Sequence, residues 1–131
     1  KERLLILDSY IKTNIMPILL ENIPIDTNTF ENAIIIEANS DVSLLNGHYE
    51  DINFVAPTWY QELIKIKDKP ILIINNLNQI PNNDQTKFIE ILKYRKISTF
   101  DLPKNCLIIV TATNLKEKPL NEEVYSLLAH I

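Results

Sequence analysis

Glycine is nearly absent from this chain. Gly47 is the only glycine among the 131 residues, whereas an average usage of about 7% would give several. A phosphate-binding loop needs glycines, because residues without a side chain let successive backbone N–H groups turn inward on a phosphate. Residue counting therefore excludes any mechanism that depends on a glycine-rich phosphate cradle.

Cysteine, long apolar runs and basic clusters are also scarce. Cys106 is the only cysteine, so no internal disulfide can form, and its place in the apolar run 102–110 predicts a buried thiol rather than a nucleophile. No run reaches the roughly 18 apolar residues that span a bilayer, and the first residues lack a secretory cleavage site. We therefore expect a soluble, cytoplasmic protein with no membrane partner.

The charge of the chain argues against one class of partner. The 13 basic and 17 acidic residues give a formal net charge of −4 and are scattered along the sequence. Binding to a phosphate backbone needs a basic stripe, which this sequence does not have. We expect no direct contact with nucleic acid.

Short apolar runs alternate with helical patterns along the chain. Strands buried on both faces are expected at residues 4–7, 33–36, 71–74 and 106–110, and helices at residues 15–23, 57–66, 82–94 and 121–129. Residues 98–104 form a small hairpin or a loop. Strands that alternate with helices predict an α/β fold, a three-layer sandwich around a parallel sheet. With 46% hydrophobic residues, residues 1–131 suffice for a single domain.

An ordered set of motifs runs from residue 57 to the end of the chain. It comprises a proline-led helix with tryptophan, a strand that ends in a residue pair, a helix with an early glutamine, and a strand that ends in asparagine: Pro57, Trp59, Asn75, Asn76, Gln85, Arg95, Pro103, Ala112, Thr113 and Asn114. This order resembles the MoxR-like branch of the AAA+ ATPases, with dynein-type domains as relatives. Residues 57–131 give the best match and residues 1–55 a weaker one. The resemblance implies a P-loop-NTPase-like fold, the AAA+ large subdomain, without its helical lid.

The resemblance places Asn75 and Asn76 where the family has the aspartate and glutamate of its Walker B motif. The aspartate supports Mg²⁺, and a neutral amide oxygen is a much poorer ligand for that ion. The glutamate polarises the attacking water, and an amide has no comparable basicity. No catalytic residue and no metal ligand is therefore assigned.

The other parts of the family's nucleotide site are degenerate as well. Lys12 and Thr13 resemble the end of the phosphate-binding loop, but the residues before them contain no glycine, and the start of a helix is the favoured interpretation. The arginine finger of the family falls near Leu127, and no arginine follows Arg95. Asn114 alone keeps the family type, that of the sensor asparagine. Lys12, Thr13 and Asn114 are thus vestigial cofactor-binding candidates.

No alternative active site is visible. His48 and His130 have no metal-like spacing to Cys106. A serine nucleophile elbow would need flanking glycines.

The leading expectation is a catalytically inactive AAA+-like domain, a pseudo-ATPase with a structural or protein-interaction role in a larger assembly. Its partners would be other proteins or ring-forming AAA+ subunits, and no cofactor is expected. Weak binding of ATP and Mg²⁺ stays open. So do two alternatives: an atypical MoxR-like ATPase completed by other segments or subunits, and a monomeric protein-binding adaptor with Tyr94, Phe100 and Tyr125 as aromatic anchors.

Overall fold

The structure of the chain is a computed structural model. It describes residues 17–22, 33–39, 47–67, 69–98 and 100–130. The expected strand at residues 4–7 lies outside these ranges.

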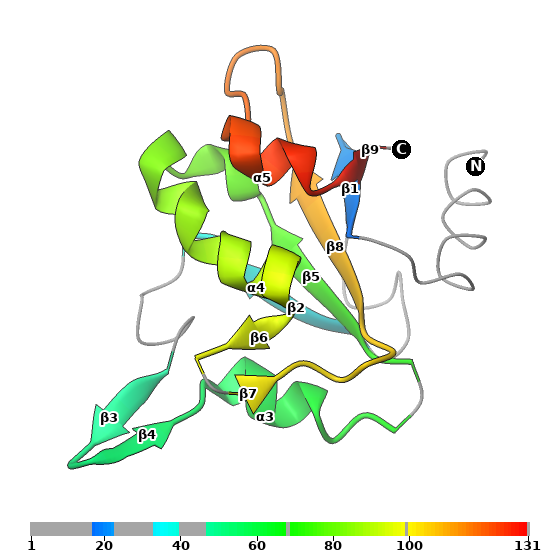
Figure 1. Cartoon of the computed structure of the whole chain (residues 1–131). Helices are drawn as coiled ribbons and strands as arrows, with labels where there is room; N and C mark the ends of the chain where they lie inside the picture. Colours follow the sequence, from blue (N-terminus) through cyan, green and yellow to red (C-terminus); the bar gives the residue numbers. More distant parts are fainter. Residues whose placement is uncertain (1–16, 23–32, 40–46, 68, 99, 131) are drawn as a thin grey trace.

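The fold is built on a five-stranded sheet in the order β2-β5-β8-β1-β9. The strands are β1 (Ile18–Glu21), β2 (Ala33–Glu37), β5 (Ile71–Asn75), β8 (Leu107–Ala112) and β9 (Ala129–His130). All four pairings in the sheet are parallel (Figure 1). The α/β expectation with a parallel sheet is confirmed, and so are the strands expected at 33–36, 71–74 and 106–110.

The helix expected at residues 15–23 is wrong, because Ile18–Glu21 forms the buried strand β1. Three consecutive apolar residues fit a buried strand and a buried helix equally well. In the sheet, Leu19 packs into one apolar cluster while Ile18 and Leu20 pack into the other. This alternation is that of a strand covered on both faces.

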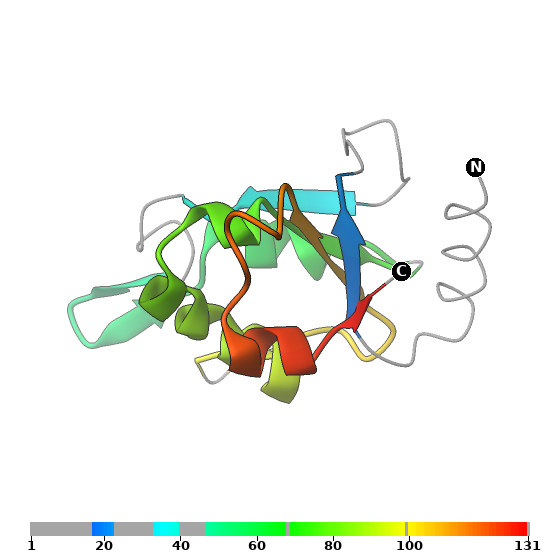
Figure 2. The same cartoon turned by 90° about the horizontal axis from the view of Figure 1, so that it is seen from above.

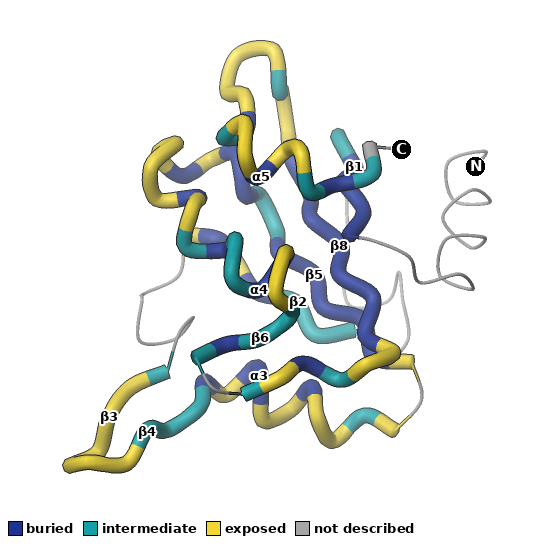
Figure 3. The backbone as a smooth tube through the Cα atoms, in the orientation of Figure 1, coloured by how far each residue is buried: buried dark blue, intermediate teal, exposed yellow. Residues whose placement is uncertain are grey.

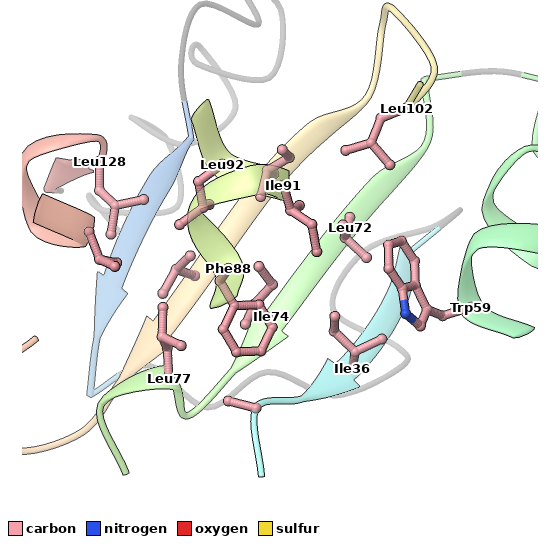
Figure 4. Close-up of a cluster of buried hydrophobic side chains, with 14 of the residues drawn as sticks. Ile36, Trp59, Leu72, Ile74, Leu77, Phe88, Ile91, Leu92, Leu102 and Leu128 are labelled. Carbon is pink, nitrogen blue, oxygen red and sulfur yellow. The ribbon is translucent and has the colours of Figure 1, made fainter. Parts of the chain in front are cut away.

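The described helices pack against one face of the sheet. They are α3 (Thr58–Leu63), α4 (Ile89–Tyr94) and α5 (Glu122–Ser126), with 3₁₀ helices η1 (Leu77–Gln79) and η2 (Asn82–Phe88). Phe88, Ile91 and Trp59 meet Leu72 and Ile74 of β5 in this core (Figure 4). The helix expected at 82–94 is therefore η2 followed by α4, and the helix expected at 121–129 ends earlier because Ala129 belongs to β9.

The opposite face of the sheet is also apolar and buried. Its central residues are Ile18, Leu20, Ile71, Ile73, Leu107 and Ile109. No helix within the described ranges packs on this face, so the described part of the molecule comprises the sheet and one of the two expected helical layers.

Two antiparallel hairpins lie outside the sheet. The hairpin of β6 (Lys96–Ile97) and β7 (Phe100–Asp101) overlaps the hairpin or loop expected at residues 98–104 but begins before it. The hairpin of β3 (His48–Glu50) and β4 (Asn53–Val55) has no counterpart in the sequence expectations. It projects from the body in two views (Figures 1 and 2), and its first strand is exposed throughout (Figure 3).

None of the helices in the described ranges combines the length and apolar character needed to cross a bilayer.

Candidate functional site at the carboxyl end of the sheet

The strand order creates a topological switch point between β1 and β8. After β1 the chain continues to β2, which lies beyond β8 and β5, and after β8 it continues to β9, which lies on the other side of β1. The connections therefore leave this neighbouring pair in opposite directions. Open α/β sheets bind their ligands outside the carboxyl ends of such a pair. The motif residues Asn75, Asn76 and Asn114 lie at this same edge.

Three strands end here in an asparagine with a left-handed backbone. Asn22 after β1, Asn76 after β5 and Asn114 after β8 have φ values of 58°, 57° and 59°. Asparagine is among the few residues other than glycine that adopt this conformation readily. In a chain with one glycine, these asparagines perform the backbone role that glycine usually has.

Asn75 belongs to a hydrogen-bond chain across β2, β5 and β8. Its Nδ2 donates to Oε2 of Glu37 at 2.7 Å, and its Oδ1 accepts from the hydroxyl of Thr111. The Thr111 oxygen in turn accepts the backbone N–H of Asn76 at 2.9 Å. Both polar atoms of the Asn75 amide are thus engaged by protein groups. This hydrogen-bond chain needs a donor at position 75, because the Glu37 carboxylate can only accept hydrogen bonds. The amide of Asn75 supplies that donor.

Backbone N–H groups at the carboxyl ends of β1 and β8 are engaged by contacts within the protein. The backbone N–H of Asn114 donates to Oδ1 of Asn22 at 3.0 Å, and that of Leu115 donates to Oε2 of Glu21 at 3.3 Å. The N–H of Asn22 donates to the carbonyl of Ala112 at 2.8 Å. These N–H groups lie where an anion would seek donors. They face an amide oxygen, a carboxylate and a backbone carbonyl instead, and the carboxylate repels phosphate.

A second amide network ties η1 to the loop after β8. Asn78 is 2% exposed; its Nδ2 donates to the carbonyls of Thr113 and Lys118, and its Oδ1 accepts from the N–H of Thr113. Gln85, 1% exposed, accepts the N–H of Asn121 at 2.7 Å. Within the described ranges no buried side-chain nitrogen or oxygen lacks a hydrogen-bond partner. The amides at this end of the sheet are therefore structural links.

Two of the predicted positions meet at one hollow. Asn76 and Asn114 line a polar depression of about 460 Å³ together with Gln79, Thr113, Glu117 and Lys118. Asn75 is directed toward Glu37 instead. The hollow contains one acid and one base, so it offers neither a cluster of carboxylates for a metal nor a cluster of cations for phosphate.

No protein-family model matches this chain, and a search of curated proteins finds no match either. The AAA+ resemblance therefore rests on the sequence motifs.

Lys12, Thr13 and Leu127 are the other candidates from the sequence. Lys12 and Thr13 lie outside the described residues, and both precede β1 in the sequence. Leu127, at the expected finger position, is partly buried and packs against the main core. Among the described residues no three histidine, cysteine or acidic side chains are grouped so as to hold a metal ion.

The expected burial of Cys106 is confirmed. The thiol is 0% exposed, and burial raises its pKa to about 11 although the nearby Arg95 acts in the opposite direction. A thiol with such a pKa is a poor nucleophile at neutral pH.

Sequence reasoning missed the partners that hold the asparagines. Glu37 follows the expected strand 33–36 just as Asn75 follows 71–74, so parallel pairing predicts their proximity once the two strands are taken as neighbours. The roles of Glu21 and Asn22 do not follow from the sequence, because the pattern of residues 15–23 predicts a helix. Thr111 looks like one more residue of a buried strand, and nothing in the local pattern marks it.

Proposed function

We propose that this chain is a catalytically inactive AAA+-like domain that serves a structural or protein-interaction role in a larger assembly. The observation that carries the proposal is that the backbone donors after β8 are engaged by Asn22 and Glu21. A nucleotide phosphate would have to displace both acceptors and lie beside a carboxylate.

The sheet order supports the AAA+-like part of the proposal. The resemblance requires that Asn75 and Asn76, at the end of one strand, lie at the same edge of the sheet as Asn114, which follows the next strand. β5 and β8 are neighbours, and Asn76 and Asn114 line the same hollow. This meeting of Asn76 and Asn114 at one edge is the arrangement that the proposal requires.

The hydrogen bonds at Asn75 support the inactive part. A residue that holds Mg²⁺ must direct an oxygen toward the ligand space. The Asn75 oxygen accepts from Thr111 and its nitrogen donates to Glu37. The Asn75 amide therefore links neighbouring strands of the sheet, and its oxygen is not directed toward a metal ion.

Titration of the full chain with a fluorescent ATP analogue and Mg²⁺ tests the proposal. We expect no saturable binding at micromolar nucleotide and no release of phosphate. The double variant Asn75→Asp with Asn76→Glu restores the two family acids and should gain no turnover, because the backbone donors after β8 stay engaged by Glu21 and Asn22. Micromolar binding with phosphate release by the unmodified chain would contradict the proposal and favour the atypical ATPase.

A further inference from the structure

The β3–β4 hairpin is anchored to the body by aromatic contacts, and within the described ranges its outer strand pairs only with β4. Phe54 stacks on Phe100 with ring centroids 5.8 Å apart, and Phe100 meets Tyr60 at 5.6 Å. The only glycine of the chain, Gly47, lies at the base of this hairpin with φ +83°, where a Cβ would come within 2.5 Å of the Val55 carbonyl oxygen. A two-stranded ribbon is marginal by itself, so these contacts hold it in place.

The outer strand β3 presents an unpaired edge among the described residues. It pairs with β4 only, in a two-stranded sheet, and its Tyr49 is 68% exposed. Asp51 is the first central residue of the two-residue turn between Glu50 and Asn53 and has the positive φ, 56°, that such hairpin turns need there. The residues that flank such a turn, here Glu50 and Asn53, form a hydrogen-bonded pair. Hydrogen-bonded and non-hydrogen-bonded pairs alternate along an antiparallel ladder, so the next pair, Tyr49 and Phe54, is not hydrogen-bonded. The N–H and C=O of Tyr49 therefore point away from β4.

The sequence of β3 is self-complementary in an antiparallel register centred on Tyr49. In that register His48 of each copy lies opposite Glu50 of the other copy. The two Tyr49 residues face each other. His48 and Glu50 already share one face of the strand, with Nε2 and Oε1 3.4 Å apart. An imidazole that hydrogen-bonds a carboxylate across strands and aromatic rings that face each other are both favourable pairs.

We propose that a second copy of this chain pairs with the outer edge of β3, so that two hairpins form a four-stranded antiparallel sheet about a two-fold axis. Tyr49 contacts Phe54 of its own hairpin at 5.2 Å, and the dimer extends this contact into a row of four rings. The antiparallel arrangement places the tip of each hairpin beside the base of the other. The two bodies therefore lie at opposite ends of the new sheet.

The contact is small. Three residues per chain make it a weak association of the kind found below about 1,200 Å² of buried surface. We expect a dissociation constant on the order of 100 μM. This inference does not depend on the proposed function, since β3 and β4 form a separate sheet and contribute no residue to the candidate site.

Sedimentation equilibrium of the full chain from micromolar to millimolar concentration tests the proposal. We expect a reversible equilibrium between monomer and dimer. His48→Glu puts acids opposite acids and should weaken the dimer by about tenfold or more. Combining His48→Glu with Glu50→His exchanges the two residue types and should restore the affinity, while each hairpin keeps its own acid–base pair.

Thr58→Glu is the matched control, because it adds an acid at an exposed position of α3 and should leave the equilibrium unchanged. Circular dichroism of each variant checks that the fold is kept. A chain that stays monomeric up to millimolar concentration would overturn the proposal. So would a dimer that is insensitive to His48→Glu, or a double variant that fails to recover the affinity.

Discussion

The amide nitrogen of Asn75 lies 2.7 Å from a carboxylate oxygen of Glu37 on the neighbouring strand. The two residues are direct partners in the parallel register of β2 and β5. This relationship gives a physical reason for asparagine at the position where the family resemblance calls for aspartate. Two carboxylates at this separation would repel each other and would have no proton donor between them.

We predict that Asn75→Asp destabilises the protein at neutral pH. The change removes a hydrogen bond to a charged acceptor and adds a repulsion, which the exposure of Glu37 partly screens, so the free energy of unfolding should fall by about 1 to 2 kcal/mol. Urea denaturation measures the loss. Adding Glu37→Gln supplies a donor again and should recover most of it. Equal stability of Asn75→Asp and the unmodified chain would show that the Asn75–Glu37 contact is not formed.

At Asn76 we predict that backbone conformation governs the response to substitution. Its φ of 57° costs most side chains about 1 kcal/mol and glycine nothing. Asn76→Gly should therefore be neutral or slightly stabilising, whereas Asn76→Ala and Asn76→Glu should each lower the free energy of unfolding by about 1 kcal/mol. Thermal denaturation of the three variants ranks them. A more stable Asn76→Glu variant would instead indicate a side-chain role for an acid at this position.

Asn78 should be the most sensitive of the amides. Asn78→Leu keeps the size of the side chain but leaves the N–H and the carbonyl of Thr113 and the carbonyl of Lys118 without this partner. The expected loss is about 2 to 4 kcal/mol of unfolding free energy. The adjacent Gln79 is exposed, and Gln79→Ala serves as the control with an expected loss below about 1 kcal/mol. Similar losses in both variants would mean that the buried network contributes little.

The extent to which the sequence predicts this fold differs between elements. β5 and β8 were predictable because runs such as residues 71–74 are apolar and flanked by residues that break them. β1 was not, because its apolar run is too short to show a period, and its strand conformation comes from pairing with β8 on one side and β9 on the other. The β3–β4 hairpin was missed because its turn has no glycine at the position that adopts positive φ, where Asp51 stands instead.

The sequence predicted where the candidate site lies but not which residues contact one another there. Asn75 and Asn76 were identified because they end a predicted strand. Their partners Glu37 and Thr111 come from other strands, and only the sheet register brings them together. Local patterns report which residues share a strand or a helix face, whereas the contacts of an amide depend on which strand lies next to it.

Burial of the Cys106 thiol should make stability depend on pH in the alkaline range. Its pKa is raised by burial from 9.0 to about 11, so the folded protein keeps the proton after the unfolded chain has released it. The stabilisation is therefore complete below pH 9 and is lost as the pH rises toward 11, by up to about 2 to 3 kcal/mol in the free energy of unfolding. Urea denaturation between pH 8 and pH 11 measures this slope.

Cys106→Ala isolates the contribution of the thiol. The variant loses some packing at neutral pH, but its stability should fall less steeply above pH 9 than that of the unmodified chain. Tyr60, whose pKa is raised by burial and by Asp101, contributes a decline of the same sign to both proteins, and Tyr60→Phe in each background removes it. The two proteins should therefore converge as the pH rises. Parallel curves for the two proteins would mean that the thiol ionises as readily in the folded state as in the unfolded chain, which its 0% exposure argues against.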